Sequence, residues 1–422
     1  MQQQKDDDKK KLKQTHIIFR HGDRAPKHNY YHIDNNTSDI SIEETREEGF
    51  ARSPNRTDEA TSETLFWKLQ MPSARILQQL NAVAPISNSS MEKLGGSKSY
   101  PYQCLTMLGV TTSIQLGEQL RRRYQSLLDS PTLANSTLIQ ARATYYTRCV
   151  QTCQSFLVGF LNLNNNNNNI SQPSLSSGVS IFVEDPSKID NLTIPQIGSL
   201  CKLKFPGAYN IYKEYKKSRV KKIRSSSSTF SPLFNYYKKS LNNDKNAGNI
   251  IMGTFDFLQS HDNHNFKQPE SLSSCIPQFI SLVSKNYWNF FHATSHRISA
   301  PLIETIIQDM QKSNSEPLNN AKIYLYSAHD SSVMGVTSGV YRIFDAEEIF
   351  NVRDWPAYNS YVSLELWCDT DDEKNLYIRC VFNNDESKFL PLERFITLWC
   401  GVFGNIILVS ILYMIKSNIS FP

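Results

Sequence analysis

Six side chains that can bind or transform a phosphate ester lie in or directly after three short apolar segments: Arg20, His21, Arg24, Arg142, His329 and Asp330. Arginine binds phosphate oxygens in pairs and keeps its charge at physiological pH. A histidine ring can attack phosphorus, and a carboxylic acid can protonate the oxygen that leaves. These residue types provide what displacement at a phosphate monoester requires, which is fixed positive charge around the equatorial oxygens and an in-line nucleophile.

His21 is the expected nucleophile, because neighbouring arginines disfavour its protonated form and keep a ring lone pair available. Asp330 is the expected general acid. This chemistry requires no metal ion and no cofactor, and its expected partner is a small phosphate monoester. Because the acid must carry a proton while His21 must lack one, we expect activity to peak on the acidic side of neutrality.

Three strands must position these side chains, and the sequence predicts them at residues 16–19, 141–146 and 323–326. The first and third lead into polar loops that contain the two histidines. The second passes directly into a predicted helix. Polar loops at the carboxyl ends of strands are where open α/β sheets bind ligands.

The remaining periodicity predicts the elements around these strands. Hydrophobic spacing and strand-to-helix passages predict helices at residues 105–124, 147–161 and 300–312. The apolar runs 362–368 and 376–382 predict a hairpin, which would set Cys368 and Cys380 on neighbouring strands.

The segment from Arg20 to Pro26 resembles the RHGxRxP signature of the histidine acid phosphatases. Its five fixed letters would occur by chance in a chain of this length with a probability on the order of 0.0001. Three further blocks resemble that family in the same order: Leu105-Thr106 with Gly109, Leu116-Gly117 and Leu120 to Tyr124; Arg142-Ala143-Thr144 with Arg148; and Tyr326 to Asp330. The resemblance covers residues 13–393 and is loosest in the middle third.

The resemblance implies a role for each of the six residues. His21 would become phosphohistidine, and Asp330 would protonate the leaving alcohol. The phosphate would be bound by four residues: Arg20, Arg24, Arg142 and His329. The fold implied is α/β, a three-layer α/β/α sandwich like that of phosphoglycerate mutase with a smaller, mainly helical cap. Residues 360–393 look most like the phosphoxylose and lysophosphatidate phosphatase branches.

The chain divides by composition into a core and an insertion. We expect residues 13–165 and 293–394 to form the α/β core, with a loop insertion at about 27–100. Residues 166–292 contain a basic run and several aromatic residues, and they are expected to form the helical cap. An asparagine-rich segment just before the cap is of low complexity and therefore predicts a surface loop.

The C-terminal stretch Phe395 to Ile415 has two interpretations. Its 21 residues carry no formal charge. A stretch of this length can cross a membrane once, and would then bring the protein into contact with it. Alternatively, its first turns belong to a buried helix of the core, because Pro391-Leu392-Glu393 is typical of a helix start.

Composition limits the partners and the compartment. Lys and Arg outnumber Asp and Glu 45 to 40, with both signs scattered, so we expect no nucleic acid partner. Eight Asn-X-Ser/Thr sequons favour a secretory route to a lysosomal or extracellular destination: Asn35, Asn36, Asn55, Asn88, Asn135, Asn169, Asn191 and Asn418. The polar segment Met1 to Gln14 contains no signal peptide, so a native leader missing from this chain is our hypothesis. The sequence does not predict the oligomeric state.

Other functions use the same pocket. A catalytically weak or silent relative would act as a secreted or membrane-bound binding or signalling protein. Such a relative is expected to lack His21 or Asp330, but both residues are present in this sequence. A mutase would pass the phosphate from the histidine to another acceptor. Because Asp330 directly follows His329, the resemblance favours hydrolysis.

Overall fold

The computed structural model describes residues 9–27, 54–87, 94–95, 99–129, 135–163, 178–185, 190, 206–237, 239, 244–265, 269–315, 321–341, 343–344 and 354–403. Its centre is one eight-stranded sheet with the order β3-β2-β4-β1-β5-β6-β7, in which β8 also pairs with β6. The strands are β1 (Lys10–Arg20), β2 (Ile139–Ala143), β3 (Ile181–Val183), β4 (Ile323–Ala328), β5 (Tyr361–Asp369), β6 (Leu376–Phe382), β7 (Asp385–Glu386) and β8 (Leu390–Pro391).

The three predicted strands and the hairpin are present, although β2 begins at Ile139 and ends at Ala143 and not at residue 146. Strands β1, β2, β3 and β4 are parallel, so their carboxyl ends meet at one edge. In the antiparallel β5–β6 hairpin, Cys368 pairs with Leu376 and Cys380 pairs with Leu364. Strand β1 begins at Lys10, earlier than its apolar run suggested, because its first polar residues pair with β5.

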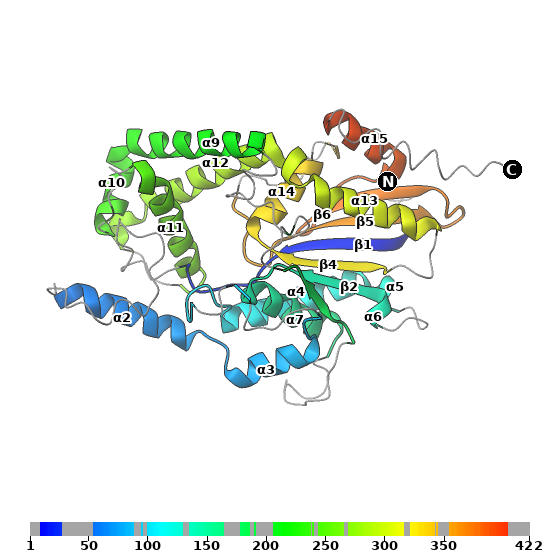
Figure 1. Cartoon of the computed structure of the whole chain (residues 1–422), viewed down its shortest axis with the longest axis horizontal. Helices are drawn as coiled ribbons and strands as arrows, with labels where there is room; N and C mark the ends of the chain where they lie inside the picture. The colour runs from blue at the N-terminus through cyan, green and yellow to red at the C-terminus, as the bar shows by residue number, and fades with distance from the viewer. Residues whose placement is uncertain are drawn as a thin grey trace.

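Helices cover both faces of the sheet (Figure 1). One face carries α3 (Ala74–Val83), α4 (Met107–Arg123) and α7 (Thr147–Phe160), and the other carries α13 (Ala300–Ser315), α14 (Asp330–Val340) and α15 (Leu392–Phe403). The predicted helices at 105–124, 147–161 and 300–312 correspond to α4, α7 and α13. The expected α/β/α sandwich is therefore confirmed.

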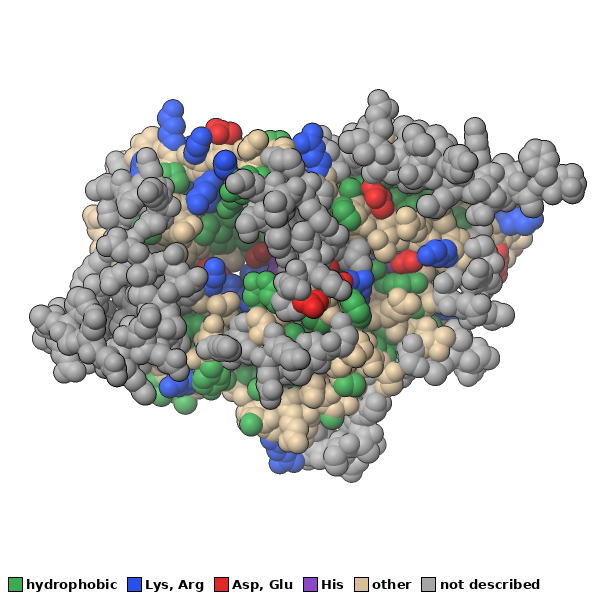
Figure 2. Space-filling model, in the orientation of Figure 1, with side chains coloured by type: hydrophobic (Ala, Val, Ile, Leu, Met, Phe, Trp, Pro, Cys, Tyr) green, Lys and Arg blue, Asp and Glu red, His purple; other side chains and the backbone are tan. Residues whose placement is uncertain are grey.

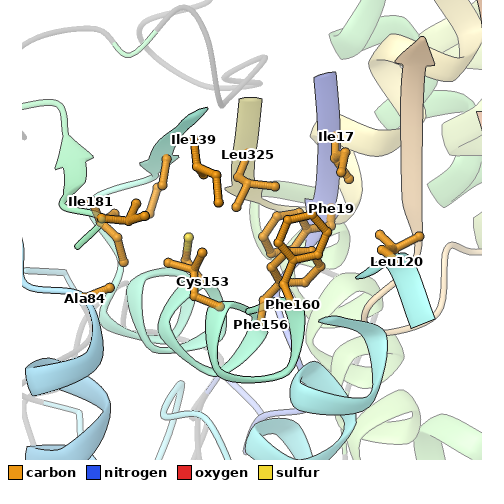
Figure 3. Packing of buried hydrophobic residues seen from close by; sticks show 14 of the residues in the cluster. Ile17, Phe19, Ala84, Leu120, Ile139, Cys153, Phe156, Phe160, Ile181 and Leu325 are labelled. Carbon is orange, nitrogen blue, oxygen red and sulfur yellow. The ribbon is translucent and has the colours of Figure 1, made fainter. Parts of the chain in front are cut away.

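Aromatic stacking fixes α7 against the sheet. The ring of Phe19 on β1 lies 4.9 Å from that of Phe156, which lies 5.1 Å from that of Phe160. Figure 3 shows these rings together between the helix and the strands, with Leu325 of β4 beside them. Burial of this apolar surface holds the first turn of α7 at the carboxyl edge of the sheet.

A group of helices lies beyond the carboxyl ends of the parallel strands (Figure 1). It contains α9 (Pro206–Ser225), α10 (Ser227–Tyr236), α11 (Asp244–Asp262), the short η4 (Glu270–Leu272) and α12 (Cys275–Ile298). These helices share an apolar cluster of their own that includes Phe230, Phe257 and Phe279. We call this group the cap. Helix α12 continues past the predicted boundary at residue 292 and packs on α14.

The loop insertion predicted at about 27–100 contains two described helices. It holds α2 (Pro54–Leu69) as well as α3, and Trp67 of α2 is fully buried against Ala25 and Tyr102. Two further short helices, α5 (Gln125–Leu128) and α6 (Asn135–Leu138), flank the entry to β2. Residues 28–53 and the asparagine run 164–169 lie outside the described residues.

The first turns of the uncharged C-terminal stretch belong to the core. Phe395 and Trp399 of α15 are buried in the cluster on the α13 face, so this part matches the buried-helix interpretation. Among the helices that the structure describes, none has the length and apolar character that crossing a membrane requires. Residues 404–415 lie outside the described residues, as do the side chains of all eight sequon asparagines.

A fully buried carboxylate joins α4 to the antiparallel half of the sheet. Glu365 of β5 accepts hydrogen bonds from Arg123 Nε at 2.7 Å, Tyr124 Oη at 3.0 Å, Trp367 Nε1 at 3.0 Å and Arg379 Nε at 3.0 Å. Burial alone would raise the pKa of Glu365, but Arg123 and Arg379 hold it below its usual value. Arg123 and Tyr124, at the end of α4, therefore bind this buried carboxylate.

We expect Glu365→Gln to destabilise the protein by about 1.5–3 kcal/mol, because Arg123 and Arg379 lose their buried counter-ion and keep only the partly exposed Glu386. Urea unfolding followed by circular dichroism measures the change. The matched control is Glu373→Gln, an exposed acid paired with Lys11 and Lys13, whose unfolding midpoint should not move measurably. Equal midpoints for the two variants would contradict this account of the network.

Candidate active site

The loop after β1 is fixed by hydrogen bonds to the neighbouring elements. The backbone N–H of His21 donates to the carbonyl of Ala328 at 2.9 Å, which continues the β1–β4 pairing by one residue. The N–H of Gly22 donates to Thr152 Oγ1 of α7 at 2.9 Å. The backbone on which His21 stands is therefore held from both the sheet and a helix.

The loop also lies directly on the start of α4. A Cβ atom on Gly109 would come within 2.2 Å of the carbonyl oxygen of Asp23, so only glycine allows this contact. Thr106 caps α4 by accepting from the Gly109 N–H at 3.0 Å, and its hydroxyl donates to Asp23 Oδ2 at 2.5 Å. The Thr106 and Gly109 pattern noted in the sequence thus serves to seat the His21 loop.

The hydrogen bonding of His21 selects which ring nitrogen can react. Its Nδ1 lies 2.9 Å from the carbonyl of Gly22, and a carbonyl can only accept, so Nδ1 carries the proton. The lone pair is left on Nε2. Burial, together with the charges of Arg148, Arg24 and Arg20, holds the pKa of His21 well below 6.5. The ring is therefore neutral and nucleophilic at mildly acidic pH.

Three arginines surround this histidine with donors that lack acceptors. Arg20, Arg24 and Arg148 are buried, and each has a buried Nε without a hydrogen-bond partner; Nη1 of Arg148 lacks one as well. Arg20 stacks 4.0 Å from the centre of the Tyr358 ring, and Arg148 lies 4.3 Å from that of Tyr146. Buried donors without acceptors are costly, so this arrangement suits an anion that accepts from several of them at once.

Arg142 is not placed with these three arginines. Its Nη2 lies 3.8 Å from Glu184 and 4.0 Å from Asp190, and its guanidinium covers the ring of Phe182 on β3. The largest charge effects that lower the pKa of His21 come from Arg148, Arg24 and Arg20. Arg142 therefore does not lie with Arg20 and Arg24, where the sequence was expected to place it, and Arg148 lies there instead.

Strand geometry explains the difference. Ala141 and Ala143 face the core under α7, so Arg142 between them points to the opposite face of the sheet. Arg142 also pairs with Tyr326, two residues before the end of β4, and so stops short of the carboxyl edge. Arg148 lies in the first turn of α7, which starts at that edge.

The second histidine loop places an acid beside the arginines. Asp330 is the first residue of α14, and its Oδ1 accepts from the Ser331 N–H at 2.7 Å. Its Oδ2 accepts from Trp355 Nε1 at 3.1 Å and lies 3.4 Å from Arg20 Nη2. About a quarter of the Asp330 side chain is exposed, so it is open to exchange a proton.

His329 lies next to His21. Its ring centre is 5.5 Å from that of His21, and its Nε2 is 3.1 Å from Thr144 Oγ1. Burial and the nearby arginines, Arg148 first, keep the pKa of His329 well below 6.5. A neutral His329 can still donate one N–H to an anion bound between the two rings.

Five of the six residues singled out in the sequence thus share one site: Arg20, Arg24, His21, His329 and Asp330. Three important neighbours were not assigned any role from the sequence. Arg148 stood in a motif block, whereas Trp355, which binds Asp330, and Asp256 of the cap, which binds Arg24, had no local signal. The site lies where Figure 2 shows a hollow between the cap and the strand ends, with basic, acidic and histidine side chains visible in it.

A buried histidine with three arginines and an acid, at the carboxyl edge of an α/β/α sandwich, is typical of enzymes that transfer phosphoryl groups through histidine. The chain belongs to the histidine phosphatase superfamily, branch 2, whose model matches residues 11–383. This membership supports phosphatase activity of the phosphoric monoester hydrolase class.

Solved structures share the fold at low sequence identity. A multiple inositol polyphosphate phosphatase of Bifidobacterium longum, in complex with inositol hexasulfate, has a TM-score of 0.56 at 11% identity and covers 94% of each chain. A phytase of Klebsiella sp. ASR1 has a TM-score of 0.52 at 13% identity, covering 92% of this chain and 95% of its own. Among curated proteins, Counting factor 60 of Dictyostelium discoideum is 21% identical over 418 residues, covering 91% of this chain and 84% of its own.

Proposed function

We propose that this protein is an acid phosphatase that hydrolyses small phosphate monoesters through a phosphohistidine at His21, with Asp330 as the proton donor. The observation that carries the proposal is the combination around His21. Its Nδ1 proton is held by Gly22, which leaves Nε2 free, while three buried arginines nearby have unpartnered donors. A neutral nucleophile inside a cationic pocket is what attack on an anionic phosphate ester needs.

The first step forms one bond and breaks one. Nε2 of His21 attacks phosphorus as the bond from phosphorus to the ester oxygen breaks, and Asp330 gives its proton to the departing alcohol. The imidazole retains its Nδ1 proton, so the adduct is cationic on the ring, and the Gly22 carbonyl continues to accept from that N–H.

The second step regenerates the enzyme. Water attacks the phosphohistidine, its proton passes to the Asp330 carboxylate, and the bond between nitrogen and phosphorus breaks to release phosphate. Asp330 is then protonated for the next turnover. The partial exposure of its side chain gives water a route to the reacting phosphorus.

The arginines carry the charge that develops on the equatorial oxygens. We assign this role to Arg20, Arg24 and Arg148, with His329 as a further donor. Arg148 takes the place that the sequence gave to Arg142, because its Nε and Nη1 are buried without acceptors in the described structure. Such fixed donors lower the barrier because they require no reorganisation when the charge appears.

The test is phosphate release from an aryl phosphate between about pH 4 and pH 8. Since the pKa of His21 lies well below 6.5, lowering the pH through 6.5 does not protonate the nucleophile, and general acid catalysis by Asp330 requires a proton on its carboxyl group. We expect the rate to peak below pH 7 and to be unaffected by a chelator. An inositol polyphosphate belongs in the substrate panel, because the structurally similar proteins include phosphatases of that class.

Two results would contradict the proposal. Activity that rises steadily through pH 8, or that a chelator abolishes, would exclude this mechanism. A folded chain that is inert across the pH range and the substrate panel, yet binds inorganic phosphate, would instead support the silent binding protein.

A further inference from the structure

The cap helix α11 contacts the loop that carries the nucleophile. Asp256 of α11 binds Arg24 and also accepts from the backbone N–H of Lys27 at 2.7 Å. At the end of the same helix, Asn263 Nδ2 donates to Asp23 Oδ1 at 3.1 Å, and His264 Nε2 lies 2.6 Å from Asp23 Oδ2. The cap is therefore attached to two consecutive residues of the loop.

The contact between Asp256 and Arg24 uses both terminal nitrogens of the guanidinium. Nη1 of Arg24 donates to Oδ2 of Asp256 at 3.3 Å, and Nη2 donates to Oδ1. Nη1 also donates to the carbonyl of Ala25 at 2.8 Å. Of the five N–H groups, one on Nη2 and the one on Nε remain, and Nε is buried without an acceptor. A bidentate pair of this kind fixes both the position and the plane of the guanidinium.

Asp256 and Arg24 each stabilise the ionised form of the other. Burial would raise the pKa of Asp256, but the charge and hydrogen bonds of Arg24, the Lys27 N–H and the charge of Arg20 hold it below its usual value. Burial would likewise lower the pKa of Arg24, and Asp256 raises it instead. Asp256 is thus an anion placed beside a site that must bind another anion.

We infer that Asp256 is a positioning residue, by which the cap holds Arg24 so that its Nε edge, and not its terminal fork, is presented to the substrate phosphate. The inference rests on the function proposed for this site. It has two physical consequences. Arg24 is preorganised for the transition state, and Asp256 offsets part of the positive charge that would otherwise bind the substrate and product phosphate more tightly.

Two variants separate position from charge. Asp256→Asn removes the negative charge and weakens the clamp, so we expect kcat to fall by roughly 10- to 100-fold, while the Kd for inorganic phosphate tightens by roughly 3- to 10-fold. Asp256→Glu keeps the charge but shifts Arg24 by about one methylene. Its kcat should fall as well, while its Kd for phosphate stays within about twofold of that of the parent.

The measurements are kcat with an aryl phosphate and Kd by titration calorimetry with inorganic phosphate. The matched control is Asp262→Asn, an exposed acid in the same helix, for which both quantities should be unchanged. Circular dichroism confirms that each variant is folded. A folded Asp256→Asn variant that keeps its kcat within twofold, or loses kcat without tighter phosphate binding, would overturn the inference.

The two proposals fail in different ways. If the parent chain shows no turnover, the proposed function fails, but the phosphate affinities of the parent and the two variants still test the role of Asp256. If the parent turns over and Asp256→Asn behaves like the parent, the function stands and this inference fails.

Discussion

Replacing His21 with alanine should reduce turnover of every phosphate ester by a factor on the order of 10⁴ or more, because no other described side chain occupies its place as nucleophile. The three arginines would remain, so the variant should still bind inorganic phosphate. Phosphate release measured on the parent and on His21→Ala gives the ratio, and calorimetry gives the affinity. When the reaction of the parent enzyme is stopped rapidly without acid, a phosphoenzyme that is stable to alkali should be trapped. The His21→Ala variant should form none.

A second variant controls for loss of packing. His21→Gln fills much of the same volume but offers no ring nitrogen, so we expect it to be as inactive as the alanine variant. Residual turnover within tenfold of the parent in either variant, together with a trapped phosphoenzyme, would place the nucleophile elsewhere in the chain.

Arg148→Gln should lower kcat/KM by about 10²–10³-fold, whereas Arg142→Gln should change it by no more than a few fold. The two substitutions are chemically identical, and only the placement of the side chains differs. Arg148 adds to the field on His21, while Arg142 is paired with Glu184 and Asp190. Steady-state kinetics with one aryl phosphate measures both.

Stability separates the catalytic effect of Arg148 from a structural one. Burial lowers the pKa of Arg148, which shows that the fold does not fully compensate this charge. Removing it should therefore leave the thermal midpoint unchanged or higher. A large loss of stability in Arg148→Gln, or a larger kinetic effect from Arg142→Gln, would restore Arg142 to the role that the sequence suggested.

The sequence predicted those parts of the site that follow apolar strands. His21 and Asp330 could be found because each lies directly after a run that must be a strand, and parallel strands end at one edge. The same logic favoured Arg142, since it lies in such a run. The alternation of side chains along β2 indicates the opposite placement, because the alanines on both sides of Arg142 face the core and Arg142 therefore points to the other face of the sheet.

The contributions of the cap could not be predicted in this way. Asp256 meets Arg24 across 232 positions of sequence, and Trp355 reaches Asp330 from a loop with no regular period. Nothing in the pattern around either residue distinguishes it from a surface side chain. Their roles come from tertiary packing, which hydrophobic periodicity does not encode. The start of β1 was missed for a related reason, since lysines that pair with acids look like a solvated tail.

The strand order of the sheet also bears on how the chain acquires its structure during synthesis. Strand β1, made first, lies between β4 and β5, whose residues follow about three hundred positions later. The nascent N-terminal strand therefore waits unpaired until most of the chain has left the ribosome, while the cap can collapse on its own cluster in the meantime. Such non-local pairing makes folding slow, and it leaves the backbone hydrogen-bonding groups of β1 without strand partners in the nascent chain.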